Sequence, residues 1–375
     1  MKNLIINYKV ENVVNKVIIA KDIENHLLKD LVSLKSDKKI LFIYDENINN
    51  QFIKKILDNI KLSGGNVISQ KVKGSKKNKS LKNLLFLFNI LIKNNFSKKS
   101  VIVSCGGGVI GDLTGLLSSL YLRGTIYFHI PSTMTAIVDS CLGGKTGINY
   151  KDVINSFGNY YHPNRVYISE RVLKSLPNRE YNAGISEILK CGLLGNKKIL
   201  TTLKLKKDFI LKRNFKILSI LIYETLKTKI THFINDVKES KKRLNLNFGH
   251  TFAHAIEMAT DQLVKKDYFR HGEAVGIGIL CEIALSNMNK PKEKNELYKL
   301  TSDILKSYHL PIKIELPSKV SKLKVQNMIY KNIFLDKKRI SSNPRYINLK
   351  KVGKPIIKEV EDLNSINEII YGFLD

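Results

Sequence analysis

Short apolar runs alternate with longer amphipathic segments through the first half of the chain. Four runs rich in β-branched residues predict strands, at residues 40–44, 66–72, 101–104 and 126–130. Three segments with helical spacing of apolar positions predict helices, at residues 50–62, 80–92 and 112–122. Strands that alternate with helices are typical of an α/β domain with a parallel sheet.

The pattern changes beyond Arg171, where strand-like runs almost vanish and long amphipathic helical patterns continue to about residue 335. With 375 residues, the chain is also longer than one hydrophobic core usually serves. We therefore expect an α/β domain over residues 1–170 and a mostly α-helical domain over residues 171–375, with the boundary near residues 169–176. Two late runs, 345–349 and 356–360, predict a small hairpin.

The charge balance is strongly basic, with 63 Lys and Arg against 33 Asp and Glu and a net charge of +30. A basic protein raises the question of nucleic acid as a partner, but only clustered charge marks such a site. The lysines are spread along the whole chain. We therefore expect no nucleic-acid partner, and a basic field that favours anionic, phosphorylated small molecules.

Cysteine usage and hydropathy predict a cytoplasmic protein without a membrane partner. The four cysteines are widely separated and form no CxxC pair: Cys105, Cys141, Cys191 and Cys281. This spacing argues against a zinc ribbon or a disulfide scaffold and fits a reducing compartment. The apolar run 84–92 is broken by Asn89 and is too short to cross a bilayer.

A glycine-rich loop follows the predicted strand 101–104. Residues 106–111 read GGGVIG, which satisfies GxGxxG and leads into a predicted helix. In this context glycines let the backbone approach a pyrophosphate at a helix N-terminus, although a tight turn is the alternative. The loop sits on the third predicted strand instead of the first, and no acid stands about 20 residues further on. Asp45, directly after the strand 40–44, is the candidate for the ribose hydroxyls.

A second glycine-rich stretch, DSCLGGKTG at residues 139–147, ends like a phosphate-binding loop. The spacing GxxxxGKT fails because Asp139 occupies the position where the first glycine is required. It is therefore not a Walker A motif. Lys145 and the neighbouring backbone amides can still hold a phosphate.

Histidines in the second half predict a metal site. His250 and His254 are spaced i,i+4 on one helical face, and His271 opens the next helical segment, in a chain with eight histidines. Two histidines and one carboxylate with an open position make a catalytic zinc-type site. The carboxylate is left open between Glu187, Glu257 and Glu273. An i,i+4 histidine pair is also common on helix surfaces and in cores.

Glu187 and Lys190 share a helical face at i,i+3. One interpretation is an ion pair on the surface of the protein. The other is a metal ligand beside a cation that binds substrate.

Together these segments resemble the 3-dehydroquinate synthase family of sugar phosphate cyclases. Seven blocks keep the family's order: GGGVIGD (106–112), YLRG (121–124), PSTMTAIVDSCLGGKTGIN (131–149), LPNREYNAGISEILK (176–190), LNFGHTFAHAIE (246–257), HGEAVGIG (271–278) and DKK (336–338). Such a series is far more specific than one motif. Cyclitol synthases are similar, and a metal-dependent alcohol dehydrogenase is the remaining enzyme alternative.

The resemblance implies roles for individual residues. The metal ligands would be Glu187, His250 and His271, which leaves His254 for the substrate phosphate or for proton transfer. NAD contacts would be Asp45, Gly107, Gly108, Val109, Asp112, Ser132, Thr133, Asp139, Lys145 and Leu176. Substrate or catalytic positions would be Asp139, Lys145, Asn155, Lys190, Lys229, Glu239, Arg243, Asn247, Lys337 and Lys338. Arg123 would be offered across a homodimer.

The activity that the resemblance implies converts 3-deoxy-D-arabino-heptulosonate 7-phosphate to 3-dehydroquinate and phosphate, a shikimate-pathway step. It implies bound NAD and Zn²⁺ or Co²⁺, with transient oxidation, phosphate β-elimination, re-reduction and aldol closure. Two positions depart from the family pattern. Lys76 stands where an acid that binds ribose is expected, and Ile154 replaces a lysine near the cofactor.

Overall fold

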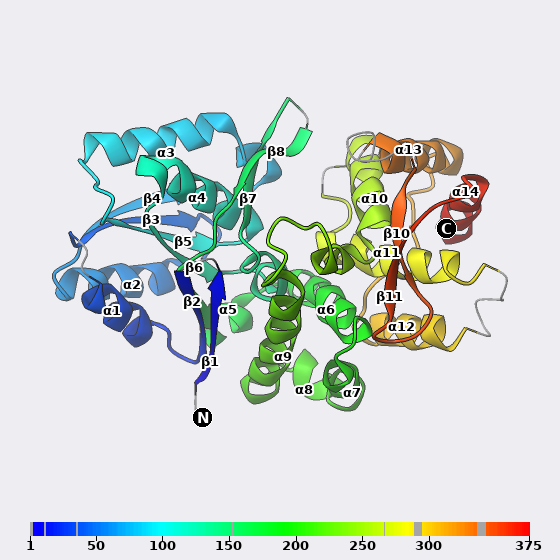
Figure 1. The fold of residues 1–375 in the computed structure, drawn as a ribbon, viewed down its shortest axis with the longest axis horizontal. Helices are drawn as coiled ribbons and strands as arrows, with labels where there is room; N and C mark the ends of the chain where they lie inside the picture. The colour runs from blue at the N-terminus through cyan, green and yellow to red at the C-terminus, as the bar shows by residue number, and fades with distance from the viewer. Residues whose placement is uncertain are drawn as a thin grey trace. The chain divides into compact units, whose positions relative to one another are not determined.

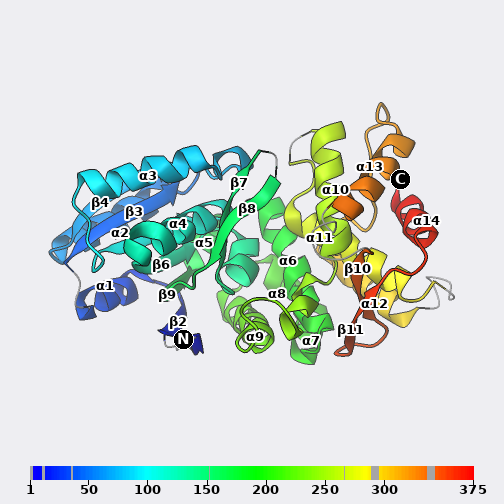
Figure 2. The same ribbon diagram turned by 45° about the horizontal axis from the view of Figure 1, so that its top comes forward.

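The computed structural model describes residues 3–10, 13–34, 37–151, 153–265, 267–288, 295–335 and 343–375. Two units make up the chain (Figures 1 and 2), the first formed by Met1–Pro177 with Phe215–Lys238 and the second by Asn178–Asn214 with Glu239–Asp375. The predicted boundary near residues 169–176 lies beside the first crossing at Pro177. The segment Phe215–Lys238, expected in the helical domain, groups with the first unit.

A seven-stranded sheet in the order β1-β2-β9-β6-β5-β3-β4 forms the centre of the first unit. Its parallel strands are β2 (Val13–Ala20), β3 (Lys39–Asp45), β4 (Asn66–Val72), β5 (Val101–Gly106), β6 (Ile126–Pro131) and β9 (Arg165–Ser169). β1 (Leu4–Val10) pairs antiparallel with β2. The parallel α/β architecture predicted from the alternating pattern is therefore confirmed, including all four predicted strands.

The pattern did not predict five strands. β1 and β2 precede residue 40, β9 follows the glycine-rich stretches, and β7 (Lys145–Tyr150) pairs with β8 (Val153–Tyr160) in a separate antiparallel pair. The placement of the glycine-rich loop on the third strand is wrong, because β1 and β2 make its strand the fifth along the chain. β5 nevertheless lies inside the sheet, between β3 and β6.

Helices cover both faces of this sheet, because successive strand residues point to opposite sides. Ile40 and Phe42 pack with α1 (Glu24–Ser33) and α2 (Asn50–Leu62). Leu41 and Ile43 pack instead with α3 (Leu81–Lys93) and α4 (Gly108–Leu120). The first unit also contains η1 (Lys76–Asn78), η2 (Tyr121–Arg123), a π-helical turn η3 (Ala136–Ser140), α5 (Glu170–Ser175) and α9 (Phe215–Phe233).

α9 belongs to the first unit because it packs on the edge of the sheet. Its last residue, Phe233, places its ring edge-on to Tyr8 of β1, with centroids 5.8 Å apart. This contact needs a strand that the apolar pattern did not predict. The assignment of α9 to one unit therefore could not follow from helical periodicity alone.

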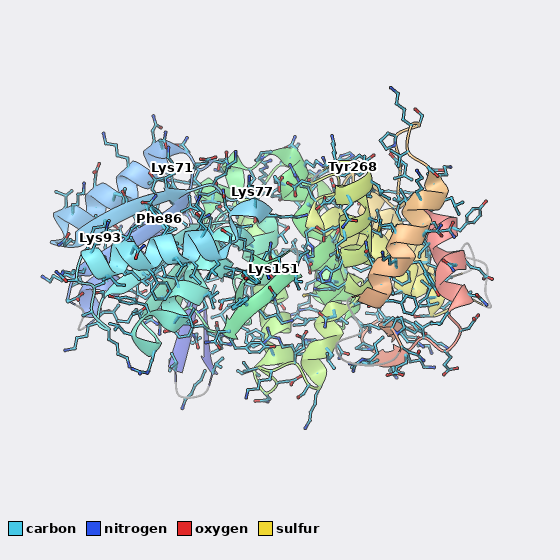
Figure 3. The ribbon with its side chains drawn as sticks, turned by 90° about the horizontal axis from the view of Figure 1, so that it is seen from above. Lys71, Lys77, Phe86, Lys93, Lys151 and Tyr268 are labelled. Carbon is cyan, nitrogen blue, oxygen red and sulfur yellow. The ribbon has the colours of Figure 1, made fainter. Side chains whose placement is uncertain are left out.

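Lysines project from the surface of the first unit without forming one stripe. Figure 3 shows Lys71 on β4, Lys77 on η1, Lys93 on α3 and Lys151 in the turn after β7, all of them exposed. Lysine is mostly found on protein surfaces in contact with water, so scattered exposed lysines need no binding partner to explain them. Within the described part of the chain, no helix is both long and apolar enough to cross a membrane.

The second unit is built mainly from helices: α6 (Asn178–Leu193), α7 (Lys197–Leu205), α8 (Lys207–Leu211), η4 (Lys242–Asn247), α10 (His250–Leu263), α11 (His271–Leu285), α12 (Glu296–Ser307), α13 (Lys322–Leu335) and α14 (Asn364–Phe373). The predicted hairpin is present as β10 (Arg345–Leu349) and β11 (Pro355–Glu359), paired antiparallel. Every residue of α11 after His271 is buried. Such a helix is apolar on all sides and forms the centre of its unit.

Glycines let the neighbours of α11 approach it closely. A Cβ on Gly272 would lie 1.8 Å from the carbonyl oxygen of Ala183 on α6, and a Cβ on Gly278 would lie 2.0 Å from that of Gly249. Both contacts are with backbone, which cannot rotate away. α6 and α10 are therefore held against α11 at distances that only glycine allows.

We expect Gly278→Ala to lower the free energy of unfolding by about 3 kcal/mol, because the added methyl forces the backbones of α10 and α11 apart. Gly276→Ala on the same helix is the matched control. Its Cβ would meet the side chains of Ser186 and Leu305 at 3.0 and 3.1 Å, which can shift. Urea unfolding of both variants measures the difference, and equal losses would contradict this account of the packing.

Candidate functional site

Glu187, His250 and His271 gather at one point of the second unit. Oε1 of Glu187 lies 3.6 Å from Nε2 of His250 and 3.4 Å from Nε2 of His271. One ligand atom from each residue lies within 4.8 Å of the other two. With zinc bonds of about 2.0–2.2 Å, tetrahedral geometry separates neighbouring ligand atoms by roughly 3.3–3.5 Å. The three side chains therefore fit a divalent cation, with one position left open.

Two of these residues, His250 and His271, are positioned by being the first residues of helices. Gly249 adopts a left-handed φ of 83° just before α10, so that His250 is the first residue of that helix. His271 is likewise the first residue of α11, where the Glu273 carboxylate accepts a hydrogen bond from the backbone N–H of Arg270 at 2.8 Å. A carboxylate in this position satisfies a free N–H group of the first turn.

Glu273 also fastens α11 to α6. Its two carboxylate oxygens accept hydrogen bonds from Nε and Nη2 of Arg179, each at 2.7 Å. A bidentate pair of this kind fixes both position and angle. Glu273 is therefore occupied at the helix start and is not the missing ligand.

The second ring nitrogen of each histidine is also fixed. Nδ1 of His250 donates to the carbonyl oxygen of Phe248 at 3.2 Å, and Nδ1 of His271 donates to Oε2 of Glu257 at 3.0 Å. Both Nε2 atoms therefore face Glu187. Histidine ligands of metals are commonly oriented through such contacts. The alternatives left open by the sequence are resolved geometrically: Glu187 faces the cluster, while Glu257 orients His271.

We expect Glu257→Leu to weaken Zn²⁺ binding about 10- to 100-fold, because the His271 ring loses the acceptor that orients it. A titration against a chelator of known affinity measures this. Gln262→Ala, at an exposed position of the same helix, should leave the affinity unchanged. Equal affinity in the Glu257→Leu variant and the wild type would refute the orienting role.

Glu187 and Lys190 form a buried ion pair. Their side chains are 1% and 2% exposed, and Nζ of Lys190 lies 2.6 Å from Oε2 of Glu187. The interpretation as a surface ion pair is therefore wrong. Within the described residues, Lys190 and the two imidazoles are the groups that face the carboxylate oxygens of Glu187, with no further hydrogen-bond donor recorded. A buried carboxylate that faces two imidazoles is chemically suited to a cation.

The charges around Glu187 act on each group differently. Burial raises the pKa of the Glu187 carboxyl, but Lys190, His271 and His250 outweigh burial and hold that pKa well below its usual range. Burial and then Lys190 lower the pKa of His250 well below its usual value. Burial also lowers the pKa of His271, yet Glu257 and Glu187 raise it to about 10. The ionised Glu187 and the neutral His250 are in the forms that bind metal.

In the first unit, the glycine-rich loop joins β5 to α4. Gly107 is the N-cap of α4, and a Cβ there would meet Cγ2 of Thr133 at 3.0 Å. The N–H of Ser132 donates to the carbonyl oxygen of Gly106 at 2.9 Å. The loop and residues 132–133 therefore lie side by side at the carboxyl ends of β5 and β6, where parallel sheets bind ligands.

Asp45 ends β3, the strand next to β5. Its Oδ1 accepts hydrogen bonds from the backbone N–H and the side-chain amide of Asn47, at 3.1 and 3.0 Å. A Cβ on Gly74 would lie 2.0 Å from Oδ2. The Asp45 carboxylate therefore fits here because Gly74 has no side chain.

Two lysines pair with predicted site residues of the same unit. Nζ of Lys79 lies 2.5 Å from Oδ2 of Asp112 and also donates to Asn155, and Nζ of Lys229 lies 2.5 Å from Oδ1 of Asp139. Burial raises the pKa of Asp112, although Lys79 opposes the shift. Lys79 was not predicted as a site residue. Its sequence signal is its place just before Ser80, in the loop 74–80 where Lys76 departs from the family pattern.

Comparison with known proteins identifies the family. The model of the 3-dehydroquinate synthase N-terminal domain matches residues 69–183, and that of the C-terminal domain matches residues 184–339. A 3-dehydroquinate synthase of Prochlorococcus marinus is 34% identical over 350 residues, which cover 92% of each chain. The chain belongs to the 3-dehydroquinate synthase family.

Further likenesses agree with this family. A 3-dehydroquinate synthase of Dictyoglomus thermophilum is 38% identical over 284 residues, covering 69% of this chain and 78% of its own. The crystal structure of 2-deoxy-scyllo-inosose synthase complexed with carbaglucose-6-phosphate, NAD⁺ and Co²⁺ aligns with a TM-score of 0.85. It is 22% identical, with 99% of this chain and 100% of that chain covered. This second likeness shows the fold.

The positions that resemble 3-dehydroquinate synthase sites divide between the two units. In the first unit lie Asp45, Gly107, Gly108, Val109, Asp112, Arg123, Ser132, Thr133, Asp139, Lys145, Asn155, Leu176 and Lys229. In the second lie Glu187, Lys190, Glu239, Arg243, Asn247, His250, His254 and His271. Lys337 and Lys338 lie outside the described residues.

The contacts and exposure of some of these family positions are defined by the structure. Nδ2 of Asn247 donates to Oε1 of Glu239 at 2.8 Å, and the rings of His254 and His250 are 5.3 Å apart. Arg243 is 3% exposed. Arg123 and Lys145 are exposed at the surface of the first unit. The individual roles of these residues in the 3-dehydroquinate synthase family remain predictions for this chain.

Proposed function

We propose that this protein is a 3-dehydroquinate synthase of the shikimate pathway, a phosphorus–oxygen lyase that depends on NAD and on Zn²⁺ or Co²⁺. It would convert 3-deoxy-D-arabino-heptulosonate 7-phosphate to 3-dehydroquinate and phosphate. The observation that carries the proposal is the cluster of Glu187, His250 and His271, in a chain that belongs to the family. A sugar phosphate is the proposed substrate, and a cytoplasmic homodimer the proposed form.

The residues of the first unit support NAD binding. The free N–H groups at the start of α4 would hold the pyrophosphate, because Gly107 and Gly108 leave room for it and the helix N-terminus attracts anions. Asp45 would accept hydrogen bonds from the ribose hydroxyls, with Asn47 already holding its Oδ1. Lys76 adds a positive charge where the family pattern has an acid, so the ribose contact would depend mainly on Asp45.

The residues of the second unit support the divalent cation and an anionic substrate. Glu187, His250 and His271 would hold the cation, with Glu257 and the Phe248 carbonyl fixing the two rings. When bound, NAD supplies reversible hydride acceptance and the cation supplies a Lewis acid.

Cationic side chains would orient the substrate in this proposal. With a cation on Glu187, the Lys190 ammonium no longer has to neutralise that carboxylate alone and can bind an anionic group of the substrate. Arg243 is almost fully buried, so its charge would act in a low dielectric. His254, exposed one turn beyond His250, would contact the phosphate or transfer a proton.

The test is an assay of phosphate release by the purified protein with NAD and Zn²⁺ or Co²⁺. 3-Deoxy-D-arabino-heptulosonate 7-phosphate should release phosphate without net formation of NADH, since the hydride returns within each turnover. NADH that accumulates during turnover would point to a dehydrogenase. Phosphate release from another sugar phosphate, with none from this substrate, would point to a cyclitol synthase.

A further inference from the structure

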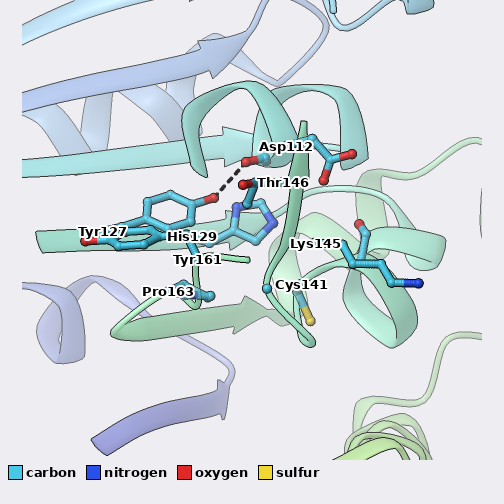
Figure 4. A pocket seen from close by; sticks show the side chains of 11 residues that line it. Asp112, Tyr127, His129, Cys141, Lys145, Thr146, Tyr161 and Pro163 are labelled. Carbon is cyan, nitrogen blue, oxygen red and sulfur yellow. Dashed lines mark hydrogen bonds between the residues drawn. The ribbon is translucent and has the colours of Figure 1, made fainter. Parts of the chain in front are cut away.

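Buried hydrogen bonds connect two strands with the glycine-rich loop, and the proposed function uses none of the side chains that make them. Ser104 lies on β5, and Tyr127 and His129 lie on β6; all three are at most 2% exposed. Oγ of Ser104 lies 2.6 Å from Nδ1 of His129 and 3.0 Å from the hydroxyl of Tyr127. That hydroxyl donates to the carbonyl oxygen of Gly111 at 3.1 Å, as Figure 4 shows.

Only one arrangement of protons satisfies all three contacts. The Gly111 carbonyl can only accept, so the single proton of the Tyr127 hydroxyl must point to it. Ser104 must then donate its proton to Tyr127, and no proton of Ser104 remains for His129. The proton between His129 and Ser104 therefore belongs to the ring, which is protonated on Nδ1.

We propose that His129 is a positioning residue for NAD binding: with its proton on Nδ1, it sets the direction of the hydrogen bonds through Ser104 and Tyr127 to Gly111. This inference rests on the proposed NAD-binding role of the glycine-rich loop. The backbone N–H of Gly111 donates to the carbonyl oxygen of Gly107 at 3.0 Å. Fixing Gly111 therefore also fixes Gly107, the residue that would approach the pyrophosphate.

Packing supports the same role. A Cβ on Gly111 would lie 3.0 and 3.1 Å from Cε1 and Nε2 of His129, so the imidazole lies directly against the first turn of α4. The ring therefore contacts the loop directly by packing, and its Nδ1 proton sets the hydrogen bonds that reach Gly111. Burial lowers the pKa of His129 to about 4, while a hydrogen bond with the Ser104 backbone opposes the shift. A neutral ring protonated on Nδ1 keeps Nε2 as an acceptor.

A small cavity beside His129 has room for a hydrogen-bond donor to its Nε2 atom. His129 and Gly111 line a cavity of ≈ 10 Å³ together with Thr146 and Tyr161 (Figure 4). This is room for about one water molecule, which needs polar partners to stay bound. A water in this cavity would donate to Nε2 and complete the hydrogen bonding of the ring.

Two tyrosines that line this cavity give a matched pair of variants. Tyr127→Phe removes the hydroxyl that donates to Gly111 in the loop. Tyr161→Phe removes a hydroxyl that donates to the carbonyl oxygen of Thr125 at 2.5 Å, outside the loop. Both lose one O–H···O=C bond, and Tyr127→Phe also loses the acceptor of the Ser104 hydroxyl. A purely structural role would therefore lower the stability of both variants and leave their Kd for NAD unchanged.

Isothermal titration calorimetry of NAD binding to the purified full chain separates the two roles. Tyr127→Phe should raise the Kd for NAD roughly three- to tenfold, the equivalent of one hydrogen bond, and Tyr161→Phe should leave it unchanged. At saturating NAD, kcat of Tyr127→Phe should stay within about twofold of wild type, because the loss lies in cofactor binding. Equal Kd values for Tyr127→Phe and wild type would overturn the inference.

His129 itself is tested by a conservative replacement. The side-chain amide nitrogen of Asn can stand where Nδ1 of histidine does, so His129→Asn should bind NAD more tightly than His129→Leu. Nitrogen NMR of the labelled wild-type protein at neutral pH should show the His129 proton on Nδ1, and a proton on Nε2 would overturn the inference. Wild-type protein that binds no NAD would instead overturn the proposed function, and this role with it.

Discussion

Replacement of His250 by alanine is expected to abolish Zn²⁺ binding at the cluster and to lower kcat/KM by at least about a thousandfold. The remaining ligands, Glu187 and His271, offer two ligand atoms where a catalytic zinc site usually has three. Metal analysis of the dialysed protein and the phosphate-release assay measure the two effects. The same outcome is expected for His271→Ala.

His254→Ala is the matched control for metal content. It makes the same substitution one turn further along α10, with its ring 5.3 Å from that of His250, but outside the cluster of possible ligands. It should keep one cation per chain even though turnover falls. Circular dichroism should show the same helix content in both variants. A His250→Ala protein with full metal content and turnover would refute the assignment of His250 as a ligand.

Lys190→Met is expected to lower turnover by about a hundredfold while the metal is retained, because the substrate loses a buried cation. In the metal-free protein it should also lower the free energy of unfolding, since the buried Glu187 loses its nearest cation and keeps only the more distant His271. Methionine keeps most of the length of the side chain, so the change in packing is small.

Zn²⁺ distinguishes this electrostatic loss from a defect of packing. The bound cation neutralises Glu187 in place of Lys190, so Zn²⁺ should stabilise Lys190→Met more than it stabilises wild type. Urea unfolding with and without Zn²⁺ measures the two increments. Lys197→Met, at an exposed position on α7, is the control and should match wild type throughout. Equal stabilisation of Lys190→Met and wild type by Zn²⁺ would contradict the proposed compensation.

The parallel sheet could be predicted where a strand leaves a continuous apolar run. β4 and α2 have the predicted bounds, because the apolar period of each is clear and a turn or a cap marks its ends. β1 was missed because one of its faces is exposed, so Asn7 and Lys9 interrupt its apolar residues. The exposed residues of β8 likewise gave no apolar run.

From local spacing alone the site could be predicted only to the level of residue types, and the family resemblance was needed to name Glu187, His250 and His271. Spacing placed His250 near His254, but the choice among Glu187, Glu257 and Glu273 depends on how three helices pack, which local spacing does not contain. The close contact of Gly272 with Ala183 makes that packing possible. Lys79 and the hydrogen bonds of Ser104 also connect segments far apart in sequence. Such contacts become visible only when the strands are placed in order.

The most direct test of the metal site is a crystal structure of the Co²⁺-loaded protein with anomalous scattering recorded at the cobalt edge. The account predicts one strong peak per chain, at about 2.0–2.2 Å from Oε1 of Glu187 and from Nε2 of both His250 and His271. A peak held by other side chains, or an active enzyme with no cation at these three residues, would contradict it.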